Sequence, residues 1–161
     1  MDVTDVVTWQ LGRPPRGSWR PAARCSFGWP TVIATAAALS DGQPFPTLFY
    51  LTCPHLTAAL AALESAGAAD AWHELLVADE ALARRLEAAD RAYRAARAEE
   101  SGGADPTPDV GIAGQRDALA TKCLHAHAAA YLAGLDDPVG EGALVGLVRE
   151  CGDDRCAGAA G

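Results

Sequence analysis

Three isolated cysteines, Cys25, Cys53 and Cys123, are the residues of this chain best suited to chemistry. Thiolates bind zinc and iron–sulfur clusters, but none of the three belongs to the close cysteine pair that structural zinc sites usually contain. Widely spaced cysteines suit a site that forms late in folding, such as a [4Fe–4S] cluster held by three thiolates. The alternative is that all three pack as small apolar side chains.

A histidine near Cys123 would complete the ligand set. His127 lies four residues after Cys123 and would share a helix face with it, whereas His125 reaches the site if Cys123 lies in an uncurled first turn. Three thiolates and an imidazole form tetrahedral zinc sites, so zinc and a [4Fe–4S] cluster both stay open, as does the absence of any cofactor. Lys122 would add charge stabilisation or proton transfer. A metal-free cysteine nucleophile with a histidine base is a further interpretation.

An arginine-rich segment precedes Cys25. Four arginines occur within residues 13–24 of an otherwise acidic protein, and prolines between them stiffen the backbone. Guanidinium groups bind phosphate and carboxylate through paired hydrogen bonds, so we expect Arg13, Arg16 and Arg24 to bind the anionic group of a substrate. The alternative is that these arginines pair with the protein's own carboxylates.

The composition indicates one domain with its own core. The chain has 161 residues, of which 50% are apolar, and its many alanines favour packed helices. The formal net charge of −8 argues against binding to nucleic acid or to an anionic membrane surface. No stretch is apolar and long enough to span a membrane, and the acidic N-terminus differs from a signal peptide. We therefore expect a cytoplasmic protein with reduced thiols.

The sequence pattern predicts a single α+β domain over residues 1–150, with a small antiparallel hairpin or sheet packed against about five helices. Strands are expected at 31–39 and 45–52, joined by a turn at Asp41-Gly42. Helices are expected at 4–11, from Pro54 to Gly67, at 68–100 with a break near 78–79, at 116–135 and at 140–149.

Three other segments are predicted to lack regular structure. Residues 13–21 contain prolines and a glycine, and residues 101–114 have the glycine content of a mobile loop or lid. Residues 151–161 are predicted to form a flexible C-terminal tail, in which we assign no function to Cys151 and Cys156.

Several short motifs, in the same order, resemble the bacterial domain-of-unknown-function family 501. They are residues 11–17 (LGRPPRG), 23–25 (ARC), 41–48 (DGQPFPTL), 50–54 (YLTCP) and 122–126 (KCLHA), within a resemblance that covers about residues 8–148. The resemblance implies that the three cysteines, Lys122, His125 and the arginine segment belong to the family pattern. It also implies that His127, Cys151 and Cys156 do not, which favours His125 as the fourth ligand.

These features together predict an enzyme of hydrolase or lyase type that uses a metal ion or cluster on a small phosphate- or carboxylate-bearing molecule. Cys25, Cys53, Cys123 and His125 would hold the metal, and Lys122 and His125 would act in catalysis. The alternative is a non-catalytic adaptor, with a structural metal or with none, that binds a protein partner through the acidic helix at 68–100.

Overall fold

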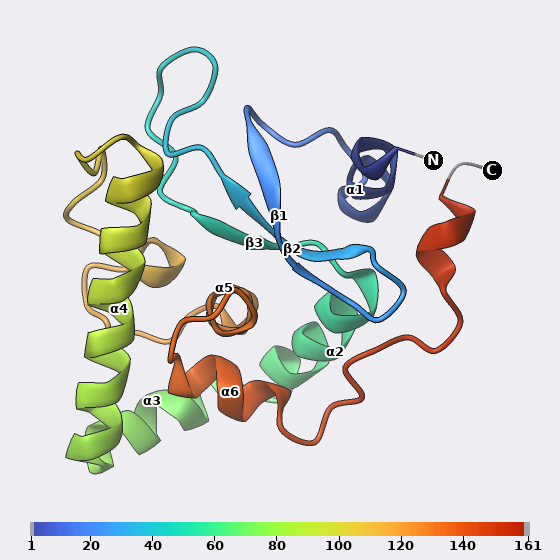
Figure 1. Ribbon diagram of the computed structural model, residues 1–161. Coiled ribbons are helices and arrows are strands. Elements are labelled where there is room, and N and C mark those ends of the chain that lie inside the picture. Colours follow the sequence, from blue (N-terminus) through green and yellow to red (C-terminus); the bar gives the residue numbers. More distant parts are fainter. Residues whose placement is uncertain (1, 160–161) are drawn as a thin grey trace.

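A three-stranded antiparallel sheet in the order β1-β2-β3 lies at the centre of the protein (Figure 1). The computed structural model describes residues 2–159, so Met1 of the predicted domain and residues 160–161 of the predicted tail lie outside it. The strands are β1 (Trp19–Arg24), β2 (Pro30–Thr35) and β3 (Phe49–Leu51). β2 pairs with β3 as the predicted hairpin, although both strands are shorter than expected.

β1 lies in a segment for which we expected no regular structure, and this prediction was wrong for residues 19–21. Trp19, Arg20 and Pro21 pair with β2, and the register shifts after Pro21. β1 has a neighbour on one side only. Proline lacks an amide hydrogen, but an edge strand needs fewer ladder hydrogen bonds and tolerates it, especially beside a bulge.

Within residues 2–159, six α-helices and two short 3-10 turns complete the single α+β domain. They are α1 (Val3–Leu11), α2 (Pro54–Ser65), α3 (Ala68–Ala78), α4 (Glu80–Glu100), η1 (Ile112–Gly114), α5 (Leu124–Leu132), α6 (Pro138–Leu144) and η2 (Arg155–Gly158). The expected break near 78–79 falls at Asp79, whose carboxylate caps α4 by accepting the Leu82 N–H. Among the described residues, no helix has the length and apolar character needed to cross a bilayer.

Two helices are shorter than the sequence predicted. α5 begins at Leu124 rather than near residue 116, because Cys123 has an extended backbone with φ of −131°. α6 ends at Leu144 rather than near residue 149, and Gly146 follows with a left-handed φ of 86°. Glycine adopts this conformation without the steric penalty that other residues meet.

The main core lies between the sheet and α5, which is surrounded by the sheet, α2, α4 and α6 (Figure 1). Leu124, Ala128 and Ala129 of α5 are fully buried, and the small alanines allow close approach. Gly140 of α6 packs so tightly that a Cβ atom there would lie 2.1 Å from the His127 carbonyl oxygen. This packing fixes the position of α5 and of the residues at its N-terminus.

The glycine-rich segment 101–114, which we expected to be a mobile loop or lid, is tied to α4. The Arg97 side chain is fully buried and donates to Asp105 Oδ1 at 2.8 Å. Asp90 accepts the Ile112 N–H at 2.9 Å. These two bonds hold the η1 turn close to α5.

Residues 151–159, which we assigned to a flexible tail, pack against the N-terminal part of the chain. Cys156 is only 6% exposed and accepts a hydrogen bond from Gln10 Nε2 at 3.4 Å. Trp29 Nε1 donates to Asp154 Oδ1 at 2.7 Å. Figure 1 shows η2 beside α1. A single turn at the end of the chain is thus anchored by one buried thiol and one indole.

Candidate functional site

A cleft runs beside β3, the strand at a free edge of the sheet. Its volume is about 460 Å³, which lies within the range of small-molecule sites. Phe49 and Leu51 of β3 and Ala126 of α5 supply apolar wall, whereas Cys123 and His125 supply reactive groups. The cleft therefore suits a ligand with an apolar body and one polar, reactive end.

Three side chains that can bind a metal lie together, and two of them line this cleft. Glu64 Oε1, Cys123 Sγ and His125 Nδ1 all lie within 4.8 Å of one another. His125 Nδ1 is 2.8 Å from Glu64 Oε1 and 4.0 Å from Cys123 Sγ. Zinc accepts oxygen, sulfur and nitrogen ligands, and catalytic zinc sites use three protein ligands with a fourth position for water or substrate. These residues form a candidate metal centre.

His125 has the orientation that a metal ligand needs. Its Nε2 lies 3.0 Å from the Thr57 carbonyl oxygen, and because a carbonyl can only accept, Nε2 must carry a proton. Nδ1 then faces Glu64 and Cys123. Metal-bound histidines usually donate the opposite ring N–H to a backbone carbonyl in this way, which fixes the tautomer.

Without a metal, a proton holds the same three groups together. Hydrogen bonding to the Cys123 thiolate, aided by the Thr57 carbonyl and the Glu64 charge, raises the pKa of His125 to about 9. Burial raises the pKa of the Cys123 thiol, but the hydrogen bonds from His125 and the Ala126 N–H outweigh it, so that this pKa is lowered overall. The protonated imidazole therefore favours the thiolate form of Cys123.

The N-terminus of α5 positions the site. Cys123 is the N-cap of α5, and His125 lies in the first turn. Glu64, near the end of α2, accepts the backbone N–H of Leu124 at 2.8 Å, which is one of the amides that a helix start leaves unpaired. Sequence reasoning missed Glu64 because no motif distinguishes it from other helical acids. Only the packing of α2 against α5 identifies it.

Arg13 and Arg16, two of the predicted anion ligands, line a recess against β2 and β3. Tyr50 lines both the recess and the cleft. Within residues 2–159, neither arginine has a carboxylate partner. Their guanidinium groups are therefore available to an external anion.

Arg24 and Lys122 have different surroundings. Arg24 donates to the Gly28 carbonyl oxygen at 2.7 Å and lines neither the cleft nor the recess. Lys122 is exposed and precedes Cys123 at the start of α5. Lys122 is therefore linked to the candidate metal centre only as the residue before Cys123. Arg24 lies outside both the cleft and the recess.

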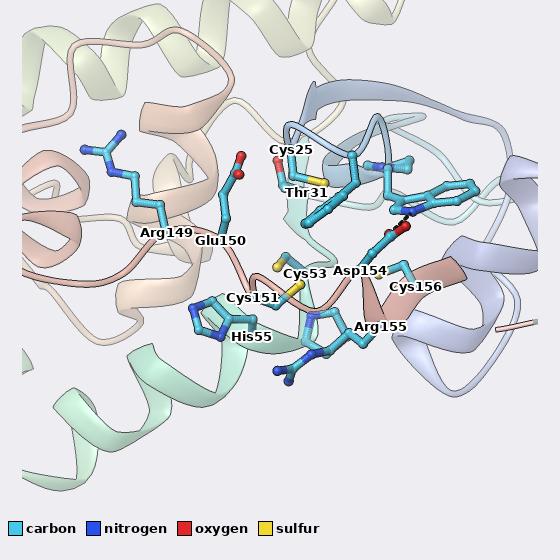
Figure 2. Close-up of a pocket in the computed structure, with 14 residues that line it drawn as sticks. Cys25, Thr31, Cys53, His55, Arg149, Glu150, Cys151, Asp154, Arg155 and Cys156 are labelled. Carbon is cyan, nitrogen blue, oxygen red and sulfur yellow. Dashed lines mark hydrogen bonds between the residues drawn. The ribbon is translucent and has the colours of Figure 1, made fainter. Parts of the chain in front are cut away.

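The structure divides the predicted cysteine ligands between two places. Cys25 and Cys53 line a second pocket together with Cys151 and Cys156, to which we assigned no function (Figure 2). Cys123 lines the cleft beside β3 instead. Cys53 and Cys123 are separated because they lie at different places along α2. Cys53 is the N-cap of α2, whereas the N-terminus of α5, where Cys123 lies, contacts Thr57 and Glu64 further along α2.

His127, which we considered as a ligand on helical spacing, is buried away from these groups. It is 1% exposed, and its Nδ1 lies 2.7 Å from Asp137 Oδ2. Asp137 also caps α6 by accepting the N–H groups of Val139 and Gly140. His127 therefore connects α5 to α6, as a structural contact.

These features define a small α+β protein with two sites that contain thiols. One of them combines a carboxylate oxygen, a thiol sulfur and an imidazole nitrogen at the cleft beside β3. The chain belongs to the family described as "Protein of unknown function (DUF501)", whose model matches residues 21–145. This match confirms the resemblance drawn from the motifs. It includes Glu64, Cys123 and His125, and it ends before Cys151. No curated protein and no solved structure matches the chain significantly.

Proposed function

We propose that the protein is a metal-dependent hydrolase of small anionic molecules, with zinc held by Glu64, Cys123 and His125. The observation that carries the proposal is the convergence of three different donor atoms within 4.8 Å at a cleft of about 460 Å³. A zinc ion bound by three protein ligands supplies Lewis-acid activation of water for attack on an ester or phosphoester.

The remaining residues are assigned to substrate binding. The apolar walls of the cleft hold the body of the substrate, and Arg13 and Arg16 bind its phosphate or carboxylate group across Tyr50. Lys122 stays a proposed catalytic residue because it is exposed beside Cys123 and can approach developing negative charge. His125 acts as a ligand. The free thiols of both sites fit a reducing compartment such as the cytoplasm.

A metal-free thiol enzyme is the second candidate. The lowered pKa of Cys123, caused by hydrogen bonds from His125 and Ala126 that outweigh burial, favours a nucleophilic thiolate. In this case Cys123 attacks the substrate carbonyl, an acyl–sulfur bond forms, and His125 protonates the leaving group. Water then hydrolyses the acyl-enzyme.

The test uses hydrolysis and metal binding together. We expect zinc to be bound, and p-nitrophenyl phosphate or a carboxylate-bearing p-nitrophenyl ester to be hydrolysed, in a Cys53→Ser/Cys151→Ser background that removes competing thiols. Glu64→Gln and Cys123→Ser should each lower zinc affinity by at least ~100-fold and hydrolysis with it. Arg16→Ala should raise KM about tenfold or more with little change in kcat, because it removes a charged hydrogen bond to the substrate.

The matched control is Glu74→Gln, because Glu74 is an exposed helical acid. It should change neither binding nor hydrolysis. Zinc that binds equally well to Glu64→Gln, Cys123→Ser and the control would overturn the proposal, whether or not either probe is hydrolysed. Hydrolysis that survives chelation but is lost on Cys123→Ser would establish the thiol enzyme instead.

A further inference from the structure

The second pocket gathers four of the five cysteines of the chain. Cys25 follows β1, Cys53 is the N-cap of α2, and Cys151 and Cys156 come from the C-terminal segment. Figure 2 shows all four lying around one pocket. Their sequence positions are as far apart as 25 and 156, so the tertiary fold alone brings these thiols together.

Specific contacts hold the C-terminal segment at this pocket. Trp29 Nε1 donates to Asp154 Oδ1 at 2.7 Å (Figure 2), and the Ser26 N–H donates to Glu150 Oε1 at 2.7 Å. Gln10 Nε2 donates to the Cys156 sulfur at 3.4 Å. Because these contacts flank Cys151 on both sides, they position it next to Cys25 and Cys53.

Two of the four thiols, Cys53 and Cys156, respond to the others electrostatically. Burial raises the pKa of Cys53, and the nearby Cys25 and Cys151 raise it further. Burial likewise raises the pKa of Cys156, with contributions from Cys53, Cys25 and Cys151. These mutual influences indicate that the four thiols lie near one another in the pocket.

We propose that Cys25, Cys53, Cys151 and Cys156 ligate an iron–sulfur cluster, a function separate from the hydrolytic centre. Four cysteine thiolates are the ligand set of both [2Fe–2S] and [4Fe–4S] clusters. Because a cluster distributes its thiolates over several irons, its ligands stand further apart than those of a single ion.

The sulfur atoms of the second pocket stand further apart than the ligands of a single zinc ion. Zinc–sulfur bonds of about 2.3 Å place tetrahedral thiolates about 3.8 Å apart. Among residues 2–159, the one group of three or more donor atoms that all lie within 4.8 Å is Glu64, Cys123 and His125. No three of the thiols in the second pocket are as close as a single zinc ion would hold them.

The charged residues and the free volume of the second pocket each set a condition for binding a cluster. Arg149 and Arg155 line the pocket, but the Arg149 guanidinium lies over the Tyr131 ring and the Arg155 guanidinium pairs with Asp153, so both must turn inward to offset the negative charge of a thiolate-bound cluster. The free space between the side chains is about 20 Å³, room for about one water. Cluster insertion therefore requires Phe27, which lines the pocket and is 40% exposed, to move outward.

The test is anaerobic reconstitution of the full chain with ferrous iron and sulfide. We expect brown absorbance, iron and acid-labile sulfide in equal amounts, and an electron paramagnetic resonance signal after reduction. Cys151→Ser and Cys156→Ser should each lose at least half of the bound iron. Cys123→Ser is the matched control, since Cys123 lies outside the pocket, and it should keep all of it.

Three results would overturn the proposal. They are wild-type protein that binds no sulfide on reconstitution, a cluster that survives both Cys151→Ser and Cys156→Ser, and a cluster lost in Cys123→Ser. Circular dichroism establishes that each variant is folded, and Cys151→Ser is informative even if Cys156→Ser unfolds, because Cys151 is only partly buried. Retention of the cluster in Cys123→Ser also separates this result from failure of the hydrolytic centre.

Discussion

Glu64 is the residue that connects the parts of the candidate metal centre. Its Oε1 lies 2.8 Å from His125 Nδ1 and also accepts the Leu124 N–H at 2.8 Å. A carboxylate at the N-terminus of a helix is stabilised by the helix dipole and by the free amides there. Glu64 therefore supplies negative charge to whichever cation, proton or metal, occupies the space between His125 and Cys123.

We predict that Glu64→Gln lowers zinc affinity by at least ~100-fold, because a neutral amide replaces an anionic ligand while the Leu124 N–H keeps an acceptor. Isothermal titration in the Cys53→Ser/Cys151→Ser background measures this change. Glu74→Gln should bind zinc as the parent does. Equal affinities for the two glutamine variants would remove Glu64 from the metal centre.

The sequence identified two of the three residues in the centre, because Cys123 and His125 belong to one short motif. Glu64 lies 59 residues before Cys123 and has no local signature, so only the packing of α2 against α5 could place it there. Cys151 and Cys156 were set aside for a similar reason. Their neighbours are glycines and acids, and nothing local indicates that Gln10 and Trp29 hold this segment in place.

At the scale of elements, α2 connects the two thiol-lined sites. Its N-cap, Cys53, accepts the Thr57 N–H at 2.9 Å, and the Thr57 carbonyl in turn accepts His125 Nε2–H at 3.0 Å. Glu64 lies near the other end of the same helix. The backbone of one helix turn thus joins a residue of the proposed cluster site to a ligand of the proposed zinc site.

α4 should stabilise the fold through Arg97. We predict that Arg97→Met lowers the free energy of unfolding by about 3–5 kcal/mol, since it removes a fully buried partner and leaves Asp105 unpaired. Urea denaturation measures the loss. Arg84→Met, which removes only an exposed pair with Glu80, should change stability by less than about 0.5 kcal/mol. Similar losses in the two variants would contradict the anchoring role of Arg97.

The same ion pair predicts a pH dependence of stability. Hydrogen bonding to Arg97 lowers the pKa of Asp105 below the value near ~3.9 of an unfolded chain. The contribution of this pair is therefore complete above the unfolded pKa and is lost as pH falls through the lower folded pKa. We expect wild type to exceed Asp105→Asn in unfolding free energy by a constant amount from pH 7 to about pH 5, and by less below about pH 4. A difference that grows on acidification would refute this assignment.

The elements with strong local signals were predicted well, and those set by tertiary contacts were not. α1 ends at Leu11, and the break between α3 and α4 falls at Asp79, as predicted. β1 was missed because the tolerance of Pro21 depends on its place at the edge of the sheet. The helix expected at 116–135 begins late, where Glu64 caps the Leu124 N–H.

At the scale of the whole molecule, the C-terminal segment completes the second pocket. Removing residues 151–161 should leave the α+β domain folded but reduce its unfolding free energy by about 1–3 kcal/mol, because Cys156 is buried and Trp29 loses its acceptor. Chemical denaturation of the shortened chain provides the measurement. An unchanged free energy would mean that this segment does not pack in solution.

The overall architecture followed from composition and pattern, whereas the grouping of functional residues did not. Alanine-rich helices around a small antiparallel sheet were expected from the sequence, and the structure confirms this α+β class. The four thiols of the second pocket come from three segments, and their meeting depends on how the chain ends pack. The packing that brings the four thiols together cannot be predicted from local sequence patterns.

The central claim, a metal bound by Glu64, Cys123 and His125, is tested most directly by anomalous diffraction from a zinc-loaded crystal. We predict an anomalous peak at the zinc edge between Glu64 Oε1, Cys123 Sγ and His125 Nδ1, at the wall of the cleft beside β3. No peak there, with zinc bound elsewhere and His125 still hydrogen-bonded to Glu64, would contradict the account and leave Cys123 as a metal-free thiol.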